Sequence, residues 1–589
     1  MTSRFINDLV LSTMSWQAFE RLIHRLLISR GYQHVRLVGG SGDGGGDLVG
    51  TYRGKRWLIQ VKKWARSVGP ATIEETVNAC RTYGADVPAI AVRAGFEPGA
   101  LELAARLRTR GIPIQLWAAP ELVQLVGLVP AGVPSASPDS QFRLRPYQED
   151  AVRLVMETMA RPDGCSGLVV LATGLGKTAV LGEVIRRCTE LKPRFRTLVL
   201  VHRNEIVYQL ERALWPFLQP EQVTVVWNGI EGPPSDMMES ADVVCACVDS
   251  VASAVKSGER LPEFDMVVVD ECHHLGTITY DRALGQMGAG KPGGPFLLGA
   301  TATPWRPDGS YLLNYFPHPL ISLDLVAGMQ QGYLANVDYR MFTDNVDWER
   351  LRQLKGNRFS PKAINRSLFI EEWDDAVVDR LQDAWKELER PRSIVFCGTI
   401  EHARKMADRV NALGFTRAAA IYSGAPGVPA LEPYERSRLL WEFAENRIGV
   451  LCAVDILNEG VDLPDVNLVV FQRVTHSRRI FVQQLGRGLR LAHGKDKVIV
   501  LDFVSDVRRF AAGLELQGSL AAGGPRPGRP VNLRLQSAVT FMRRNRPDQD
   551  GASFLREWLG DLQEVEEAGE DMSILCYPRL DHLPGERGH

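Results

Sequence analysis

Three features are scarce in this chain of 589 residues: paired cysteines, net charge and long apolar runs. The nine cysteines are scattered and none lies in a Cys-x-x-Cys pair. This pattern predicts neither a structural zinc site nor a disulfide framework, and it fits a reducing cytoplasm. The net charge of −1 excludes a strong global field, so any nucleic-acid contact must use local basic surfaces. No apolar run is as long as a membrane span, and the first residues lack a signal-peptide pattern.

The remaining composition is that of a globular protein with several domains. Hydrophobic residues make up 45% of the chain and charged residues 24%, which are ordinary values for soluble globular chains. A chain of this length exceeds what one hydrophobic core usually supports. We therefore expect three or four domains, of α/β class, as the motifs below indicate.

A glycine-rich turn at residues 171–178, Leu-Ala-Thr-Gly-Leu-Gly-Lys-Thr, organises the chain. A short apolar run typical of a buried parallel strand precedes it, and a helical pattern follows. The backbone N–H groups of such a turn, with the helix dipole behind them, bind phosphates. Lys177 adds charge for the terminal phosphates and Thr178 can hold Mg²⁺. The turn departs from the strict P-loop pattern at one position, because Leu171 stands where that pattern has its first glycine. The nucleotide-binding residues predicted in this turn are Thr173, Gly174, Gly176, Lys177 and Thr178.

The N-terminal region combines a helix, a glycine loop and a strand. Ser15 is expected to cap a helix with one apolar face, and Glu20 lies beside that face. Asp47 ends a glycine-rich loop at residues 38–49. In the strand that follows, Gln60 and Lys62 point to the same side. The Asp47 carboxylate and the Gln60 amide oxygen suit Mg²⁺, and Lys62 could position the attacking water or stabilise charge on a phosphate.

On these residues, the stretch 10–125 resembles the Mrr-like restriction endonuclease domain, a branch of the PD-(D/E)xK nucleases in which Gln replaces the usual acid. The resemblance implies metal-dependent cutting of DNA, with Asp47, Gln60 and Lys62 as the core and Glu20 as a further catalytic candidate. Asp43 is expected to shape the loop. A glycine-rich hairpin with exposed polar residues is the alternative. A basic rim could bind phosphates or could be a solvated edge. Its residues are Arg53, Lys55, Arg56, Lys63 and Arg66.

A second group of motifs begins after a Pro- and Gly-rich linker. Residues 144–148, Leu-Arg-Pro-Tyr-Gln, resemble the adenine-reading entry of superfamily 2 helicases, in which Gln148 would bond the base. An apolar strand ends in Asp270 and Glu271, and such acids need partners or a metal. Asp270 can hold Mg²⁺ through water, and Glu271 can activate the water that attacks the γ-phosphate. The stretch 297–304 resembles the helicase motif that links hydrolysis to domain movement.

The last motifs lie in a second set of buried strands, at about residues 391–510. The stretch 455–464 follows one of these strands and contains Asp462, which we assign to the nucleotide site. In Gln483-Gln-Leu-Gly-Arg-Gly-Leu-Arg490, two arginines three residues apart share one helix face. Arg487 and Arg490 could reach across an interdomain cleft and stabilise transition-state charge. A solvated helix face is the alternative.

Together, residues 142–510 resemble a superfamily 2 DEAD/DEAH-type motor, nearest to the group of XPB-like helicases, RadD-like proteins and type I restriction motor subunits. The resemblance implies two RecA-like parallel-sheet domains, with ATP between them and a nucleic-acid strand across both. The Asp-Glu-Cys-His motif differs from that of some relatives at its third position. ATP hydrolysis should be unaffected, because the first two residues of the motif carry out that reaction. RadD-like proteins carry C-terminal cysteine clusters, and only Cys576 lies late in this chain.

The sequence thus predicts an ATP-dependent DNA translocase or helicase joined to a Mg²⁺-dependent DNA endonuclease, in a restriction or antiphage setting. A repair helicase whose N-terminal domain only binds DNA is one alternative, and an RNA remodelling ATPase is another. The tail could dock on the motor or serve an oligomer, and partner proteins of a defence system also fit. The predicted segments are a nuclease domain (1–125), a linker (126–140), a first RecA-like domain (141–310), a connecting region (311–390), a second RecA-like domain (391–510) and an unassigned C-terminal extension (511–589).

Overall fold

The structure is a computed structural model of the chain. It describes residues 5–7, 10–11, 14–38, 46–62, 66–129, 143–192, 194–302, 312–323, 327–328, 331–341, 358–359, 371–422, 428–454, 466–472, 497–503 and 575–576. Within these residues, no helix is both long enough and apolar enough to pass through a bilayer.

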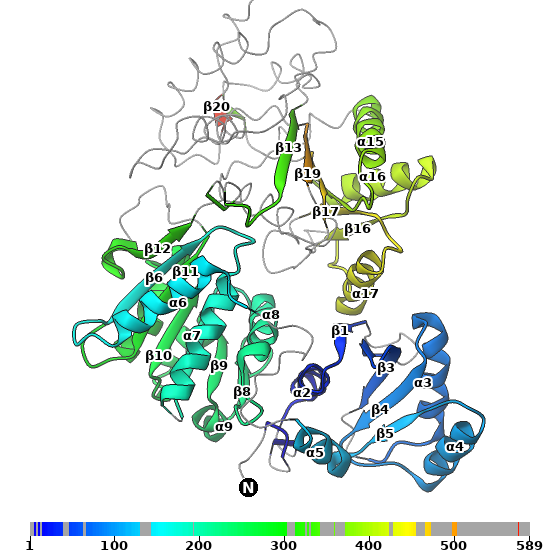
Figure 1. Ribbon diagram of the computed structural model, residues 1–589, viewed down its shortest axis with the longest axis horizontal. Coiled ribbons are helices and arrows are strands. Elements are labelled where there is room, and N and C mark those ends of the chain that lie inside the picture. The colour runs from blue at the N-terminus through cyan, green and yellow to red at the C-terminus, as the bar shows by residue number, and fades with distance from the viewer. Residues whose placement is uncertain are drawn as a thin grey trace, which may run out of the picture. The chain divides into compact units, whose positions relative to one another are not determined.

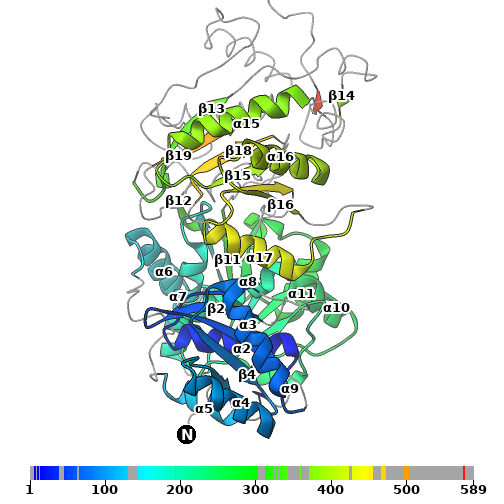
Figure 2. The same cartoon turned by 90° about the vertical axis from the view of Figure 1, so that its right-hand side faces the viewer.

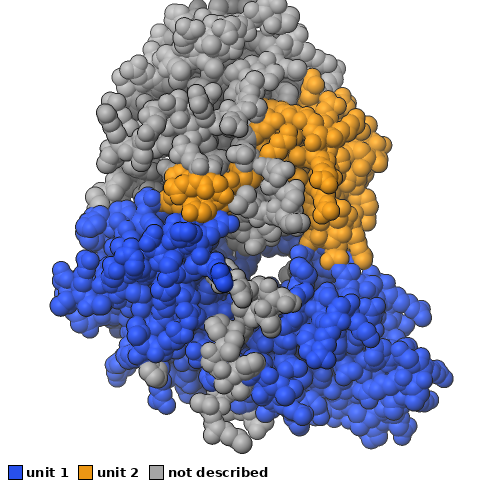
Figure 3. All heavy atoms as spheres, in the orientation of Figure 1, with its two compact units in different colours: residues 1–171, 176–322, 432–441 blue, residues 172–175, 323–431, 442–589 orange. Residues whose placement is uncertain are grey.

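The chain divides into two compact units (Figure 3). Unit 1 contains residues 1–171, 176–322 and 432–441, and unit 2 contains the remaining residues. Unit 1 carries two sheets and unit 2 carries one large sheet, and each sheet is described below with its own helices. The division cuts through the glycine-rich turn, whose residues 172–175 are counted with unit 2.

The first sheet of unit 1 has five strands in the order β1-β2-β3-β4-β5. The pairs β1/β2 and β2/β3 are antiparallel, whereas β3/β4 and β4/β5 are parallel. The strands are β1 (Gln33–Leu37), β2 (Leu48–Tyr52), β3 (Lys55–Lys62), β4 (Val87–Val92) and β5 (Gln115–Trp117).

Helices cover both faces of this sheet (Figure 1). Helix α2 (Trp16–Ser29) begins where the sequence predicts, because the Ser15 side chain accepts a hydrogen bond from the N–H of Ala18 at 3.1 Å. Its apolar stripe packs with α5 (Ala119–Gly127) on one face of the sheet. Helices α3 (Pro70–Tyr83) and α4 (Pro98–Thr109) cover the other face. Trp441 of unit 1 packs edge-on against Tyr83, with ring centroids 5.3 Å apart.

The second sheet of unit 1 has seven strands in the order β12-β6-β11-β10-β7-β9-β8. From β6 through β8 in this order, all neighbouring strands are parallel, so the polar residues that follow the strands meet at one edge. These strands are almost fully buried and most are rich in Val and Leu, as expected for a sheet with helices on both faces. The strands are β6 (Ser166–Leu171), β7 (Thr197–Val201), β8 (Thr224–Trp227), β9 (Val243–Cys247), β10 (Met266–Asp270), β11 (Phe296–Thr301) and β12 (Pro319–Leu323).

The helices of this sheet follow its strands along the chain (Figure 1). The two that matter most below are α7, which begins inside the glycine-rich turn, and α8, which follows β7. The helices are α6 (Pro146–Met159), α7 (Lys177–Leu191), α8 (Asn204–Leu214), α9 (Ser235–Ser240), α10 (Val248–Lys256) and α11 (Ile278–Met287).

Unit 2 contains a six-stranded sheet in the order β13-β19-β18-β15-β17-β16, in which all neighbouring strands are parallel. Helices α15 (Glu371–Lys386) and α16 (Ile400–Leu413) pack on it (Figure 2). The strands are β13 (Asn336–Met341), β15 (Ser393–Phe396), β16 (Ala418–Tyr422), β17 (Val450–Val454), β18 (Leu468–Phe471) and β19 (Lys497–Asp502). Helix α17 (Pro433–Ala444) precedes β17, and the short strands β14 (Arg358–Phe359) and β20 (Leu575–Cys576) pair with each other.

The predicted α/β class is confirmed: one mixed sheet and two largely parallel sheets carry the fold. Helix α5 ends at Gly127, so it runs two residues past the start of the segment predicted as a linker. Residues 130–142 lie outside the described residues.

Candidate active sites

The glycine-rich turn has the backbone of a phosphate-binding loop. It leaves β6 after Leu171 and enters α7 at Lys177. Gly174 and Gly176 have φ of +92° and +80°, values that L side chains rarely adopt. The first N–H groups of α7 lie directly behind the loop, so the helix dipole favours an anion there. Thr178 is in the first turn of α7, and the Thr173 hydroxyl is buried with no hydrogen-bond partner among the described residues.

Gln148 lies against this loop. Its side-chain oxygen accepts a hydrogen bond from the N–H of Arg145 at 2.9 Å, which closes the first turn of α6. A Cβ added at Gly176 would collide with the Gln148 amide nitrogen, so the glycine is needed for space as well as for its φ. The structure therefore brings Gln148 to the phosphate loop.

Asp270 and Glu271 lie at the carboxyl end of β10, beside the same loop. The Lys177 Nζ is 3.4 Å from Glu271 Oε1, and the N–H of Glu271 donates to Asp270 Oδ1 at 3.0 Å. His273 Nδ1 is 3.2 Å from Glu271 Oε2 and 3.0 Å from the Thr301 hydroxyl, at the end of β11. One chain of contacts therefore joins the loop to the ends of two strands.

The pKa values of the two acids are shifted in opposite directions. Burial, with the neighbouring charge of Glu271, raises the pKa of Asp270 to about 6. Burial also opposes ionisation of Glu271, but Lys177 and His273 outweigh it and hold the pKa of Glu271 below its ordinary range. Glu271 is therefore a carboxylate at neutral pH, as a residue that orients an attacking water must be.

Glu271 also has a strained backbone. Its φ of +50° and ψ of +49° lie in the left-handed region, which is uncommon for residues other than glycine. Such conformations cost about 1–3 kcal/mol and persist where the surrounding structure enforces them. The strain turns the chain sharply after β10 and directs the Glu271 side chain to Lys177.

The second candidate site lies on the five-stranded sheet. Asp47 Oδ2 accepts a hydrogen bond of 2.6 Å from the N–H of Val61, the residue between Gln60 and Lys62. The N–H of Asp47 donates to the carbonyl of Ile59 at 3.0 Å. Gly46 permits this approach, because a Cβ there would lie 2.7 Å from a methyl group of Leu58. The structure thus brings Asp47 to the strand segment that carries Gln60 and Lys62.

Gln60 is fully buried and has partners on helix α3. Its amide nitrogen donates to Glu75 Oε2 at 3.2 Å, and its oxygen lies 2.5 Å from the Thr76 hydroxyl, whose single proton is shared with the Thr72 carbonyl at 2.7 Å. A side-chain amide oxygen has two lone pairs, so the bond from Thr76 leaves one for a further ligand. Thr76 was not a predicted site residue, because nothing in the sequence pairs it with Gln60.

Glu20, the further catalytic candidate, is affected by the charge of Asp47. Burial, together with the negative charge of Asp47, raises the pKa of Glu20 to about 7, while Arg212 and Arg21 lower it. Two carboxylates that disfavour each other's charge in a half-buried site are a recognised mark of a functional centre.

Both sites fit the groups that their chemistry implies. A divalent cation at Asp47 and Glu20 would relieve the repulsion between the two carboxylates, and the second lone pair of Gln60 is an oxygen donor of the hard kind. The described residues hold no group of three or more His, Cys, Asp or Glu side chains placed for a metal. At the phosphate loop, the Thr173 hydroxyl is buried with no hydrogen-bond partner among the described residues, which fits a bound nucleotide phosphate.

Three predicted residues cannot be placed. Asp462, Arg487 and Arg490 lie outside the described residues. His273 is the residue of the nucleotide site whose role the sequence analysis missed. Its position three residues after Asp270, at the end of the strand motif, was the available signal.

Three family models match successive parts of the chain. Residues 11–126 match a restriction endonuclease family of the Mrr type, residues 141–306 match the family of the type III restriction enzyme res subunit, and residues 376–492 match the helicase conserved C-terminal domain.

Individual relatives match less than two thirds of the chain. One relative is the Schizosaccharomyces pombe protein irc3, which is named as a mitochondrial ATP-dependent helicase. It is 28% identical over 65% of this chain and 61% of its own length. The endonuclease subunit of the type I restriction enzyme EcoAI of Escherichia coli is 25% identical over 62% of this chain and 47% of its own. The chain thus spans about half to three fifths of the length of these relatives.

Among solved structures, the ATP-dependent type ISP restriction-modification enzyme LlaBIII, bound to DNA, aligns with 94% of this chain and 42% of its own, with a TM-score of 0.52 and 16% identity. The fold and the family matches define the class: a restriction endonuclease domain joined to a helicase-type motor. More closely, the endonuclease domain is of the Mrr type and precedes both helicase domains in the chain, as the sequence resemblance predicts. These families imply ATP and a divalent metal.

Proposed function

We propose that this protein is an ATP-driven DNA translocase or helicase that also cuts DNA at a metal-dependent endonuclease centre, in a restriction or antiphage setting in the cytoplasm. The observation that carries the proposal is the hydrogen bond of Asp47 to the amide between Gln60 and Lys62, which assembles the nuclease residues in the same chain as a formed phosphate loop. The family matches and the restriction-enzyme relatives support it.

In the nuclease centre, Asp47 and Gln60 would hold Mg²⁺, which would neutralise charge at the scissile phosphate when bound. Lys62 lies on the same strand face as Gln60. Its positive charge would orient the attacking water or stabilise the negative charge that develops on the scissile phosphate in the transition state. Glu20 is the second carboxylate of the centre. Thr76 keeps the Gln60 amide in one orientation, which selects its oxygen as the donor toward the metal.

In the motor, the turn at Thr173, Gly174 and Gly176 binds the phosphates, and Gln148 reads the adenine. Thr178 and Asp270 would hold Mg²⁺ with the nucleotide, and Lys177 would supply positive charge for the terminal phosphates. Glu271 then orients the attacking water. The assignments of Asp462 to the nucleotide, and of Arg487 and Arg490 to transition-state charge, stay predictions from their motifs.

The test uses the full chain with plasmid DNA, Mg²⁺ and ATP, beside Lys62→Ala and Lys177→Ala chains. We expect wild type to cut, Lys62→Ala to hydrolyse ATP without cutting, and Lys177→Ala to lose ATPase activity. If Lys177→Ala also loses cutting, the motor licenses the cut. ATPase stimulation by duplex DNA, single-stranded DNA and RNA identifies the polymer on which the motor acts.

Intact plasmid with wild type, under conditions in which DNA stimulates its ATPase, would contradict the nuclease part of the proposal. Phage DNA with modified bases then separates an unmet substrate requirement from a DNA-binding domain that does not cut. Stimulation by RNA alone would contradict the choice of DNA.

A further inference from the structure

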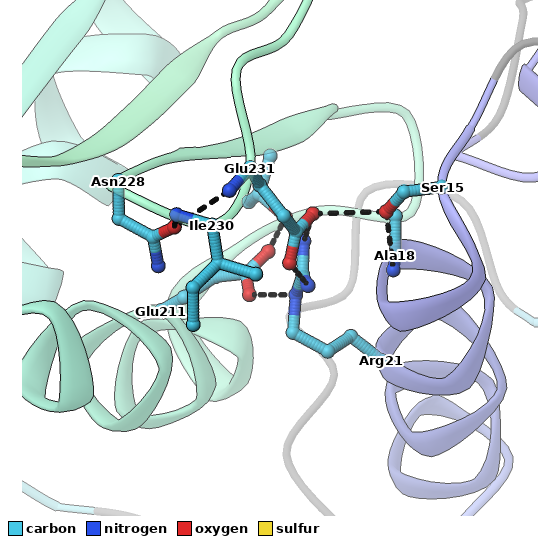
Figure 4. Close-up of polar contacts among 8 residues, drawn as sticks. Ser15, Ala18, Arg21, Glu211, Asn228, Ile230 and Glu231 are labelled. Atoms are coloured by element: carbon cyan, nitrogen blue, oxygen red, sulfur yellow. Dashed lines mark hydrogen bonds and ion pairs between the residues drawn. The ribbon is translucent and has the colours of Figure 1, made fainter. Parts of the chain in front are cut away.

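Helix α2 of the nuclease domain carries an arginine that reaches the first motor domain (Figure 4). Arg21 Nε donates to Glu211 Oε2 of α8 at 2.8 Å. Its Nη1 and Nη2 donate to the two carboxylate oxygens of Glu231, at 2.5 and 3.2 Å. Two acids that lie 190 and 210 residues further along the chain therefore hold one side chain of α2.

These three residues, the arginine clamp (Arg21, Glu211 and Glu231), are almost completely buried. Their side chains are only 10%, 3% and 8% exposed. Glu231 ends a tight turn in which Asn228 Oδ1 accepts from the N–H groups of Ile230 and Glu231, at 2.9 and 2.8 Å (Figure 4). Loss of one partner from a buried ion pair leaves an uncompensated charge, which is strongly destabilising. The clamp therefore favours a single register between α2 and α8.

Contacts on both sides of the clamp join the same two surfaces. At the start of α2, the Ser15 hydroxyl donates to Glu231 Oε2 at 3.1 Å. One turn after Arg21, the Arg25 guanidinium donates to the carbonyl of Gln219 at 3.1 Å. From Ser15 to Arg25, the contact spans about 15 Å of the helix. Two further contacts are the N–H of Phe5 with the carbonyl of Pro220, at 2.9 Å, and the ring of His24 with the ring of Trp215, with centroids 5.3 Å apart.

Apolar packing beside the clamp is incomplete. A cavity of about 410 Å³ lies between the two surfaces, and the three clamp residues are among those that line it. Since side chains do not fill this space, the ion pairs decide the register here rather than interlocking apolar side chains. The apolar walls come from both sides, with Met14, Ala18 and Leu22 on one and Val226, Ile230 and Met237 on the other.

We propose that α2 is a docking helix, which holds the nuclease domain on the first motor domain as one body, and that the arginine clamp sets its register. The docking surface of the motor consists of α8 and the turn that ends in Glu231. A nuclease domain held in this way moves with the first motor domain. Its orientation then comes from side-chain contacts and not from the covalent connection at residues 130–142. The inference goes beyond the proposed function, since docking needs neither DNA, nor ATP, nor a metal.

The test uses the full chain with a protease recognition sequence inserted between residues 134 and 135. After cleavage, sedimentation at a series of dilutions gives the Kd between the two parts, in buffer without nucleotide, DNA or divalent metal. We expect the parts of the wild-type chain to stay together at micromolar concentrations. Arg21→Met and Glu231→Gln should each raise the Kd about 30-fold or more, a typical loss when one partner of a buried ion pair is removed.

Glu190→Gln is the matched control. Glu190 pairs with Arg186 of the same motor domain at 2.5 Å, but its side chain is 45% exposed and makes none of the contacts described above. Its Kd should stay within about threefold of wild type. The contact of Trp441 with Tyr83 is present in every chain and therefore cancels in these ratios.

Circular dichroism before cleavage checks that each variant is folded. Glu231→Gln keeps the shape of the side chain, so it carries the test if Arg21→Met does not fold. Separation of the wild-type parts at micromolar concentrations would overturn the inference, and so would a Kd within about threefold of wild type in the folded clamp variants. An equal rise in Glu190→Gln would also overturn it, because the loss would not depend on the docking surface. No readout involves DNA cutting, so a failure of docking is distinguishable from a failure of the proposed function.

Discussion

The two candidate sites differ in how their acids are balanced. In the nucleotide site, the acid that must be ionised has its own cation, since Lys177 lies 3.4 Å from Glu271. In the nuclease centre, burial and the negative charge of Asp47 raise the pKa of Glu20, and the positive charges of Arg212 and Arg21 lower it. The acid of the first site therefore has a cation beside it, whereas a divalent cation bound at the second site would add the missing positive charge.

The largest effect should come from breaking the internal ion pair of the nucleotide site. Lys177→Ala removes the phosphate ligand and leaves Glu271 without its counter-charge, so ATP hydrolysis should fall by about 10²-fold or more. The ATPase rate at saturating DNA measures this loss. Lys192→Ala is the control, because that lysine pairs with Asp265 on the surface of the same domain. An ATPase rate within a few fold of wild type in Lys177→Ala would contradict the assignment.

The need of the nuclease centre for a cation should appear in thermal unfolding without nucleotide. A divalent cation at about one hundred times its Kd stabilises the folded form by about 2.7 kcal/mol, which is a shift of a few degrees in Tm. Asp47→Asn should abolish the shift, because it removes one of the two charges. An equal shift in wild type and Asp47→Asn would show that the cation binds elsewhere.

The orientation of Gln60 can be tested through Thr76. Thr76→Val keeps the shape of the side chain but removes the hydroxyl that donates to the Gln60 oxygen, so the buried amide loses a partner at a cost of about 1–3 kcal/mol. We expect cutting to fall about tenfold, with ATPase unchanged. Thr76→Ser retains the hydroxyl and should cut nearly as wild type does. Loss of cutting in both variants would assign the effect to packing.

The smallest effect concerns pH. Glu20 has an ordinary pKa of 4.5 when unfolded and a pKa of about 7 when folded, so between these values the folded form binds more protons. Its contribution to stability is present below pH 4.5 and is lost as the pH rises through about 7. Glu20→Gln should therefore gain Tm relative to wild type as the pH rises from 5 to 7.5. A difference in Tm that does not change with pH would contradict the raised pKa.

The sequence alone predicts those parts of both sites that lie close together along the chain. Hydrophobic periodicity and turn chemistry predict three local features: the phosphate loop, the strand that ends in Asp270 and Glu271, and the strand with the Gln60-x-Lys62 spacing. The strands that carry these features are β6, β10 and β3, in that order. The Ser15 cap of α2 is likewise confirmed by its bond to Ala18.

Contacts between distant segments could not be predicted. Arg21 and Glu211 are 190 residues apart, and no periodicity of either helix indicates that they pair. Thr76 and Gln60 come from a helix and a strand whose packing depends on the whole sheet. The left-handed backbone of Glu271 is a tertiary effect, because local preference alone disfavours it.

The central claim is that one chain holds two separate catalytic centres, and one measurement addresses it directly. Plasmid cutting and ATP hydrolysis are followed in the same tube for wild type and for Lys62→Ala, with Mg²⁺, ATP and DNA present. The account predicts that Lys62→Ala hydrolyses ATP at the wild-type rate and leaves the DNA intact, while wild type cuts it. Equal cutting by the two chains would contradict the nuclease centre described above.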